Sequence, residues 1–370
     1  MNERILISGA SIAGMTAAYW LAEHGFRPTV VERAAGPRAG GNGVDLRGLA
    51  VDVVDRMGIL PQVRAAAADV RGMKFVDAGD RTIARIEIAG ASEVEIMRGD
   101  LVGLLREATS GVEFLFGDSI RHLDQDDAGV TVAFEHAETR RFDLVVGADG
   151  LHSTVRRLAF GPEDRFLRHR HHYFAFADAD AALGEDRWVT MYNVPGRMAG
   201  IYRSGNHAAA KAYFVFRSGP LSYDHRDIDQ HKRLVSAAFA GDSWRTRELL
   251  AAAVADPDFY FDALSQVRMP TWHTGRIVLV GDAAWCPSPA SGAGAELALT
   301  GAYRLAGQLA KAGGDHRLAF PRYRAAHRRD VRKRQRIGTN VRLMVPRTAA
   351  GAWARNALAR LPLPRPATTS

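Results

Sequence analysis

The stretch that decides the fold is Arg4-Ile-Leu-Ile-Ser-Gly-Ala-Ser-Ile-Ala-Gly14, which an alanine-rich segment ending near Gly25 follows. An apolar run, a glycine turn and a helical segment, with a second apolar run at residues 28–32, predict a βαβ unit of about 30 residues. Gly9 permits the tight turn, and Gly14 lets helix and strand approach closely. The helix N-terminus would then point its free N–H groups at a dinucleotide phosphate.

Two residues modify this predicted phosphate site. Glu32 ends the second strand, where its carboxylate can accept hydrogen bonds from an adenosine ribose. Ser11 stands where the middle glycine of the Gly-x-Gly-x-x-Gly pattern belongs, and because serine is small we expect a tighter loop that still binds. The alternative is an ordinary strand–turn–helix without a ligand, but the position of Glu32 favours the binding site.

A second glycine-rich loop lies far along the chain. It reads Gly281-Asp-Ala-Ala-Trp-Cys-Pro-Ser-Pro-Ala-Ser-Gly-Ala-Gly294 and follows the apolar run Arg276-Ile-Val-Leu-Val. Asp149-Gly150 follows a similar apolar run between the two loops. One glycine-rich loop is a weak signal, but two in this order indicate a single flavin held by distant parts of the chain.

Composition limits the other classes of function. The 370 residues, 47% of them hydrophobic, can form one large domain or two interleaved ones. The net charge of +8 is compatible with nucleic-acid binding, but no zinc-finger or RNA-binding signature is present. We therefore expect no nucleic-acid partner, and we assign the charge to attraction of an anionic cofactor or substrate.

The cellular setting follows from cysteine usage and hydropathy. Cys286 is the single cysteine, which excludes an internal disulfide and fits a reducing cytoplasm. No secretory signal pattern opens the sequence, and no apolar run reaches the roughly 18 residues of a membrane helix. We expect a cytoplasmic protein without a membrane span.

These patterns predict an α/β fold in which a Rossmann-like dinucleotide-binding domain is interleaved with an antiparallel-sheet substrate domain, with helices at the C-terminus. The sheet is indicated by alternating segments such as Trp188-Val-Thr-Met-Tyr. The expected boundaries are residues 1–71, 98–164 and 271–318 for the first domain, residues 72–97 and 165–270 for the second, and residues 319–370 for the C-terminal helices and tail.

The ordered set of motifs resembles a known family. Gly9-x-Ser-x-x-Gly14, Glu32, Arg98, Asp149-Gly150, Gly281-Asp282 and Pro289-x-x-Gly292-x-Gly294 resemble the single-component flavoprotein aromatic hydroxylases, whose prototype is para-hydroxybenzoate hydroxylase. The pattern is closer still to the tetracycline-inactivating monooxygenases and their relatives in actinobacterial secondary metabolism. The resemblance runs from residue 4 to about residue 345.

The resemblance implies an activity as well as a fold. It implies FAD as cofactor, NADPH or NADH as reductant, and transfer of one oxygen atom from O₂ through a flavin C4a-hydroperoxide. The implied substrate is an aromatic or polyketide-type small molecule, with hydroxylation the expected outcome and epoxidation or Baeyer–Villiger insertion left open. A role in antibiotic biosynthesis or modification and a monomeric or homodimeric state are expected as well.

The resemblance also implies residue roles, none of them catalytic by side chain. Asp282 would hydrogen-bond the flavin ribityl chain, Arg98 would contact the phosphate or ribityl region, and the backbone of Pro289, Gly292 and Gly294 would line the flavin edge. Asp149-Gly150 with Arg156 resembles a fingerprint linked to FAD and nicotinamide binding. The expected cofactor-binding residues are Gly9, Ser11, Ile12, Ala13, Gly14, Glu32, Arg33, Asp45, Arg47, Arg98, Asp149, Gly150, Asp282, Pro289, Gly292, Ala293, Gly294 and Ala295.

Two departures from the family pattern are present. Trp285 replaces the histidine that usually follows Gly-Asp-Ala-Ala, which should alter packing beside the ribityl loop and leave the carboxylate unaffected. Ala293 and Ala295 stand where relatives carry polar residues, so we expect the flavin edge to depend on backbone donors alone.

Substrate and metal sites are less well defined by the sequence. The candidates for a substrate pocket between the flavin and the sheet are Phe176, Thr190, Tyr192, Lys211 and Tyr213, and the alternative for each is a plain core position. His169, His171 and His172 suggest a metal cluster, but no carboxylate or cysteine pattern completes one, so no metal is expected.

Other flavoprotein functions remain as alternatives. A flavin halogenase would carry a Trp-x-Trp-x-Ile-Pro motif, which is absent. An oxidase or dehydrogenase, a ligand-sequestering flavoprotein without oxygen insertion, and a non-enzymatic FAD-binding regulator stay open at this point.

Overall fold

The chain forms two compact units. The computed structural model describes all residues except 1–2, 37–39, 88–93, 337–340, 342–343 and 360–370. The first unit comprises residues 1–67, 92–170 and 265–338, and the second comprises residues 68–91, 171–264 and 339–370. The interleaved α/β organisation is confirmed. The C-terminal segment is divided between the units, because residues up to 338 belong to the first.

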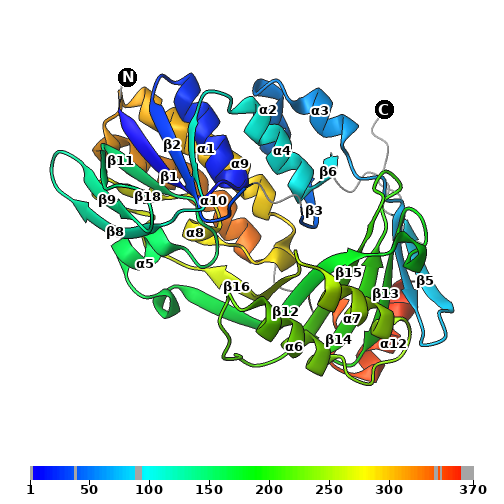
Figure 1. The fold of residues 1–370 in the computed structure, drawn as a ribbon. Coiled ribbons are helices and arrows are strands. Elements are labelled where there is room, and N and C mark those ends of the chain that lie inside the picture. The colour runs from blue at the N-terminus through cyan, green and yellow to red at the C-terminus, as the bar shows by residue number, and fades with distance from the viewer. Residues whose placement is uncertain (1–2, 37–39, 88–93, 337–340, 342–343, 360–370) are drawn as a thin grey trace. The chain divides into compact units, whose positions relative to one another are not determined.

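A six-stranded sheet forms the centre of the first unit (Figure 1), with the order β17-β18-β11-β1-β2-β7. Its strands are β1 (Arg4–Ser8), β2 (Arg27–Glu32), β7 (Glu113–Phe116), β11 (Leu144–Gly147), β17 (His273–Thr274) and β18 (Ile277–Leu279). All its neighbouring strands are parallel except β17 and β18. Ile5, Leu6 and Ile7 are fully buried, as expected for a parallel strand covered on both faces.

The first unit also contains helices. They are α1 (Ile12–Glu23), α2 (Leu49–Arg56), α3 (Leu60–Ala65), α4 (Arg98–Ala108), α5 (Thr154–Phe160), α8 (Asp282–Trp285), α9 (Gly294–Lys311) and α10 (His316–Gln335), with the 3₁₀ turns η1 (Glu163–Arg165) and η3 (Pro289–Ser291). The helices α1 and α5 pack directly on strands of this sheet. The helix α1 also packs against α9 and α4, and α9 also contacts α10 and α2.

Two small antiparallel sheets complete the first unit. The strands β8 (Ile120–Gln125), β9 (Val130–Phe134) and β10 (Arg140–Phe142) form one, and β3 (Gly43–Leu46) pairs with β6 (Val94–Met97) to form the other. Arg98 directly follows β6 and begins α4, so the second pair lies beside that arginine.

The parallel strands bring four sequence motifs to one edge. Gly9 follows β1, Arg33 follows β2, Asp149 lies two residues after β11, and Gly281 lies two residues after β18. Since the carboxyl ends of parallel strands share an edge, these motifs meet where open α/β sheets bind their ligands.

A seven-stranded sheet forms the second unit, in the order β16-β12-β15-β14-β13-β4-β5. Its strands are β4 (Gly72–Val76), β5 (Thr82–Glu87), β12 (Leu167–Ala179), β13 (Trp188–Val194), β14 (Arg197–Tyr202), β15 (Ala210–Arg217) and β16 (Tyr260–Val267). The run from β12 to β13 is antiparallel as predicted, but β13 and β4 are parallel. The β4–β5 hairpin comes from a separate early segment, so no tight turn from β13 dictates its direction.

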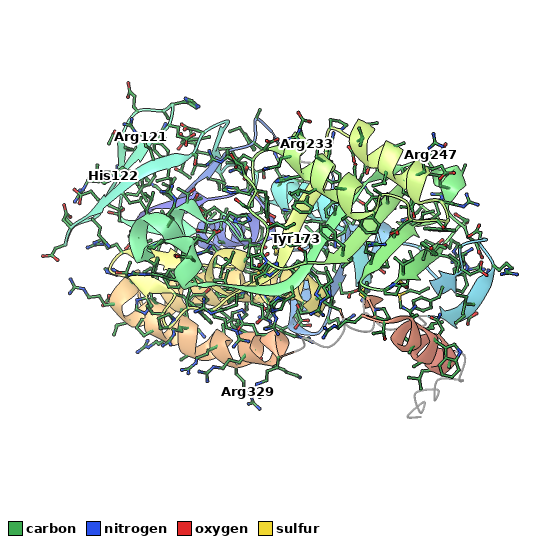
Figure 2. All side chains as sticks on the ribbon, turned by 90° about the horizontal axis from the view of Figure 1, so that it is seen from below. Arg121, His122, Tyr173, Arg233, Arg247 and Arg329 are labelled. Carbon is green, nitrogen blue, oxygen red and sulfur yellow. The ribbon has the colours of Figure 1, made fainter. Side chains whose placement is uncertain are left out.

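Two helices cover one face of this sheet. The helices α6 (Ile228–Ala238) and α7 (Thr246–Ala255) pack through Val235, Phe239 and Leu249 on Tyr173 and Phe214. Arg233 of α6 and Arg247 of α7 point away from the sheet in Figure 2. The 3₁₀ turn η2 (Ala181–Leu183) follows β12.

The helix α12 (Ala349–Ala359) lies on the opposite face of the sheet. The guanidinium of Arg355 is 4.0 Å from the ring centroid of Phe75, and it also donates a 3.0 Å hydrogen bond to Asn193 Oδ1. Phe75 pairs with Met191, whereas the neighbouring row on the α6–α7 side joins Lys74 to Thr190. Different elements therefore contact the two faces of this sheet: α6 and α7 pack on one face, and α12 packs on the other.

Candidate functional site

The loop Gly9–Gly14 follows β1 as predicted and requires glycine at both ends. Gly9 has φ +104°, and a Cβ atom there would lie 2.6 Å from the carbonyl oxygen of Ala148. A Cβ on Gly14 would lie 1.8 Å from the carbonyl oxygen of Gly9. No larger residue fits either position, because the backbone of β1, α1 and β11 meets there without space for a side chain.

The N-terminus of α1 is left uncapped by its own N-cap residue. The hydroxyl of Ser11 makes no capping hydrogen bond to the helix. It accepts a 2.6 Å hydrogen bond from Nη2 of Arg98 instead. The first-turn N–H groups of a helix have no intrahelical acceptor, so Ile12, Ala13 and Gly14 offer donors for an anion, with a guanidinium beside them.

Glu32 is fixed at the end of β2 by two backbone donors. One carboxylate oxygen accepts a 2.8 Å hydrogen bond from the N–H of Ala10, and the other accepts a 2.9 Å bond from the N–H of Ala34. These bonds place the carboxylate against the glycine loop. Each carboxylate oxygen has a second lone pair, which can accept a hydrogen bond from a hydroxyl group. Arg33 is exposed at the same strand end.

The β3–β6 pair positions Arg98, Asp45 and Arg47. The N–H of Arg98 donates to the carbonyl of Asn42 at 2.9 Å, and a Cβ on Gly41 would lie 2.9 Å from the Cβ of Arg98. Asp45 and Arg47 form a half-buried ion pair at 2.8 Å. The segment that carries Asp45 and Arg47, two of the expected cofactor-binding residues, thus lies against the start of the helix that begins at Arg98.

Asp149 and Gly150 form a rigid turn after β11. The carboxylate of Asp149 accepts hydrogen bonds from the Ser153 hydroxyl at 2.5 Å and from the Val155 N–H at 3.0 Å. Burial raises the pKa of Asp149, and these two donors oppose that shift. Gly150 has φ +81°, and a Cβ there would meet no atom within 4 Å.

A buried arginine joins this turn to the second glycine loop. Arg156 is fully buried, and its guanidinium donates to the carbonyl oxygens of Leu151 at 2.5 Å and Ala283 at 3.0 Å. Glu163 accepts a further bond at 3.1 Å. Sequence reasoning noted Arg156 beside Asp149-Gly150 but did not include it among the site residues. The signal that could have revealed its role is its place in the first turn of a helix, three residues after Ser153.

The second loop packs directly on the first. Gly281 has φ +65°, and a Cβ there would lie 2.7 Å from the Cβ of Ala13. Asp282 follows as the first residue of α8 and is half-buried. The two glycine loops therefore meet at Gly281 and Ala13, and Asp282 directly follows this point of contact.

The segment Pro289–Gly294 forms a turn and a helix start. Pro289 begins η3, and Gly292 adopts the left-handed conformation at φ +61°. A Cβ on Gly292 would lie 3.7 Å from Asp45 Oδ2, so this turn faces the strand β3 that carries Asp45. The helix α9 begins at Gly294 with Ala293 as N-cap, and neither Ala293 nor Ala295 has a side-chain oxygen to cap its free N–H groups.

Trp285 occupies an aromatic cluster behind this loop. Its ring centroid is 4.6 Å from that of Trp272 and 4.7 Å from that of His327 in α10. A Cβ on Gly301 would lie 2.7 Å from Trp285, so α9 approaches the indole closely. Trp285 is the last residue of α8 and packs into this cluster, whereas Asp282 is the first residue of the same helix.

These observations test whether a dinucleotide fits. The cofactor residues expected from sequence all lie in the first unit. Most of them come after a parallel strand, whereas Asp45, Arg47 and Arg98 lie in or directly after the antiparallel strands β3 and β6. Two uncapped helix N-termini, one guanidinium and two carboxylates suit phosphates, ribose hydroxyls and an electron-rich ring edge. The residues present therefore fit a flavin dinucleotide.

The five predicted substrate residues do not share one face of the second sheet. Phe176 pairs with Tyr213 in β15, and Lys211 lies two residues along the same strand. Thr190 pairs with Ile201, which faces α6 and α7, and Tyr192 pairs with Ala199 on that same side. Register therefore places Thr190 and Tyr192 on the face opposite the other three candidates, so a pocket on one face of the sheet can include only one of these two groups.

Three further features bear on function. No group of three potential metal ligands is found within the part of the chain that the structure describes. No described helix is long and apolar enough to cross a membrane. The basic run of α10 forms an outer helix face, from which Arg329 projects outward in Figure 2.

Comparison with known proteins agrees with this site. Residues 3–318 match the model of a family described as "FAD binding domain". An uncharacterized protein of Mycobacterium tuberculosis is 42% identical over 90% of this chain and 91% of its own length. A flavin-dependent monooxygenase of Legionella longbeachae is 37% identical over 91% of this chain and 88% of its own length.

A solved structure supports the same relationship. The crystal structure of the tetracycline destructase Tet(51) superposes with a TM-score of 0.88 and 34% identity, covering 97% of this chain and 96% of that one. The match spans both units of the present chain. The chain belongs to the FAD-binding-domain family of flavin-dependent monooxygenases, of the para-hydroxybenzoate hydroxylase type.

Proposed function

We propose that this protein uses NADPH or NADH to insert one oxygen atom from O₂ into an aromatic or polyketide-type small molecule, by hydroxylation. The observation that carries the proposal is the convergence of Gly9–Gly14, Glu32, Asp149 and Asp282 on one sheet edge, with the α9 N-terminus facing Asp45. When bound, FAD supplies the redox and oxygen chemistry, and the protein supplies binding, orientation and electrostatics.

Each part of the site has a proposed role toward FAD. The α1 N-terminus and Arg98 bind the pyrophosphate, and Glu32 accepts hydrogen bonds from the adenosine ribose. Asp282 accepts hydrogen bonds from the ribityl hydroxyls. The roles of Asp149-Gly150, Asp45 and Arg47 are to shape the walls around the cofactor.

The N-terminus of α9 is proposed to stabilise negative charge on the flavin ring edge. Its donors are backbone N–H groups, because Ala293 and Ala295 carry no polar side-chain atom. A helix N-terminus carries roughly half a positive charge and is fixed in place before any reaction. This arrangement requires Gly292 to turn the chain in the left-handed conformation, and it needs no polar side chain at the ring edge.

The substrate is proposed to bind on the sheet face that carries Phe176, Lys211 and Tyr213. The rings of Phe176 and Tyr213 have centroids 6.1 Å apart, and Lys211 forms an ion pair with Asp178. Flat rings and one cation suit an oxygen-rich aromatic or multi-ring polyketide. The similarity to a tetracycline destructase supports tetracycline-like molecules as the first candidates.

Substrate-stimulated consumption of the reductant tests this function. The FAD-loaded protein is mixed with NADPH or NADH in the presence of single aromatic or polyketide compounds, and product masses are recorded. We expect one compound class to accelerate the loss of reductant and to gain one oxygen atom. Reductant loss with hydrogen peroxide release and an unchanged compound, for every compound tested, would favour an oxidase over the proposed monooxygenase.

A further inference from the structure

A polar hollow lies on the α6–α7 face of the second unit. Its volume is about 220 Å³. The residues that line it are Lys74, Asp80, Ala182, Leu183, Gly184, Glu185, Thr190, Trp244 and Arg245. None of them belongs to the proposed cofactor site, and Thr190 lies on the face opposite Phe176 and Tyr213.

Strand register builds one wall of the hollow. Thr190 of β13 pairs with Lys74 of β4, and Lys74 pairs with Arg85 of β5. Paired residues of neighbouring strands share a face, so a hydroxyl, an ammonium and a guanidinium stand side by side in one row.

The acids of the hollow are already engaged by these cations. Glu185 accepts hydrogen bonds from Lys74 at 2.7 Å and from Arg85 at 2.9 Å. Across the hollow, Asp80 accepts bonds from the Trp244 indole N–H at 2.8 Å and from Arg245 at 3.1 Å. Burial raises the pKa of each carboxyl, but these donors outweigh it, so the pKa of both Glu185 and Asp80 lies below its ordinary value.

Thr190 adds a buried hydroxyl that makes no hydrogen bond to the described residues. The residue is 2% exposed, and its Oγ1 atom has no hydrogen-bond partner among the residues that the structure describes. Buried hydroxyls in native proteins are nearly always satisfied, so an exception on a cavity wall points to a missing partner. Because Thr190 lines the hollow, a molecule inside it can supply that partner.

We propose that the hollow binds a small oxyanion of the carboxylate or phosphate class. Lys74, Arg85 and Arg245 bring three positive charges against the two of Asp80 and Glu185, and Lys74 has donors beyond its bond to Glu185. The remaining donors and the Thr190 hydroxyl call for an acceptor-rich anion. The volume lies below the roughly 300 Å³ at which pockets for drug-sized ligands begin, so the ligand is compact.

Calorimetric titration of the FAD-loaded full-length protein tests the site. Malonate and inorganic phosphate serve as separate probes, because both are small oxyanions but one is an organic carboxylate and the other is inorganic. The variants are Thr190→Val, which keeps the shape and removes only the hydroxyl, and Lys74→Met. Thr82→Val, on the exposed part of β5, and Lys333→Met, on the outer face of α10, are matched controls.

Thr190→Val should fold, because replacing an unpaired buried hydroxyl by a methyl group removes no protein contact. We expect one probe or both to bind the parent protein, and Thr190→Val and Lys74→Met to weaken that binding about tenfold or more. Malonate binding alone would assign an organic carboxylate, and phosphate binding alone a phosphate or phosphate ester. Failure of both probes to bind the parent, or equal binding by parent and Thr190→Val, overturns the proposal.

This test is separate from that of the flavin site. The residues of the hollow and the proposed FAD contacts belong to different units. FAD content measured on the same samples therefore reports on the cofactor site alone. Loss of anion binding with full FAD content assigns the effect to the hollow.

Discussion

Nη2 of Arg98 donates a 2.6 Å hydrogen bond to the hydroxyl of Ser11, across a sequence separation of 87 residues. The serine that departs from the glycine pattern thus holds an arginine beside the uncapped N-terminus of α1. The fixed positive charge and the free N–H groups favour the same ligand, a phosphate.

We expect Ser11→Ala to weaken FAD binding about fivefold, because the anchor of Arg98 is a hydrogen bond worth about 1 kcal/mol. Titration of apo-protein with FAD measures the change. The double variant with Arg98→Met should bind no more weakly than Arg98→Met alone, since the two residues act as one unit. Independent, additive losses would show that Ser11 acts without Arg98.

Asp282→Ala should weaken FAD binding by about 1.5–3 kcal/mol, because charge-assisted hydrogen bonds to ribityl hydroxyls are lost. The melting temperature of the apo-protein should stay near that of the parent. Asp124→Ala, at an exposed position of β8, is the control for loss of one negative charge. Unchanged FAD affinity would leave Asp282 with a purely local role at the start of α8.

Gly292→Val should damage the flavin site more than it damages stability. Gly292 and Gly313 both have φ +61°, so valine costs similar backbone strain at either position. Gly292→Val should also push the α9 N-terminus away from the flavin edge, lowering the flavin midpoint potential and the yield of product per NAD(P)H. Gly313→Val should leave both quantities at parent values. Equal behaviour of the two variants would place the ring edge elsewhere.

His327 should make the protein less stable in acid. Its pKa is about 3, lowered first by burial and then by the charge of Arg304. In the unfolded state the pKa of histidine is about 6.5. At pH values between this pKa and the folded-state pKa of about 3, His327 binds the proton in the unfolded state but not in the folded state. The free energy of unfolding should therefore fall as pH falls through this window, by at most about 1.4 kcal/mol per pH unit.

Urea unfolding of the parent and of His327→Gln at several pH values checks this expectation. The variant should lose most of the slope that His327 contributes, while His122→Gln, at an exposed site on β8 (Figure 2), should keep it. Parallel pH profiles for parent and His327→Gln would mean that His327 takes up a proton without unfolding.

The placement of the glycine turns at the ends of parallel strands could be predicted from the sequence, because its signals are local. Gly9, Gly14 and Gly281 are required by backbone approaches that only glycine permits, and each lies next to a strand end that apolar runs reveal. These positions converge because the carboxyl ends of parallel strands lie at the same edge of a sheet. The link from Arg156 to Ala283 could not be predicted, since it depends on the depth to which α5 is buried.

The substrate half was less predictable because sequence alternation does not define register. Alternation shows which residues of β13 share a face, but it does not show which residues of β15 lie on that same face of the sheet. Thr190 pairs with Ile201, and Ile201 pairs with Ala212, the residue before Tyr213, which itself pairs with Phe176. Only this chain of pairings shows that Thr190 and Phe176 lie on opposite faces. The same pairing reveals the row of Lys74 and Thr190 that lines the polar hollow.

The most direct test of the oxygen-transfer account is isotope labelling of the product. The FAD-loaded protein is supplied with NADPH or NADH, a compound that accelerates reductant loss, and isotopically labelled O₂ in unlabelled water. The account predicts a product that carries one labelled oxygen atom, with loss of labelling when O₂ is unlabelled and the water is labelled. A product whose new oxygen derives from water, or an oxidised product without a new oxygen atom, would contradict it.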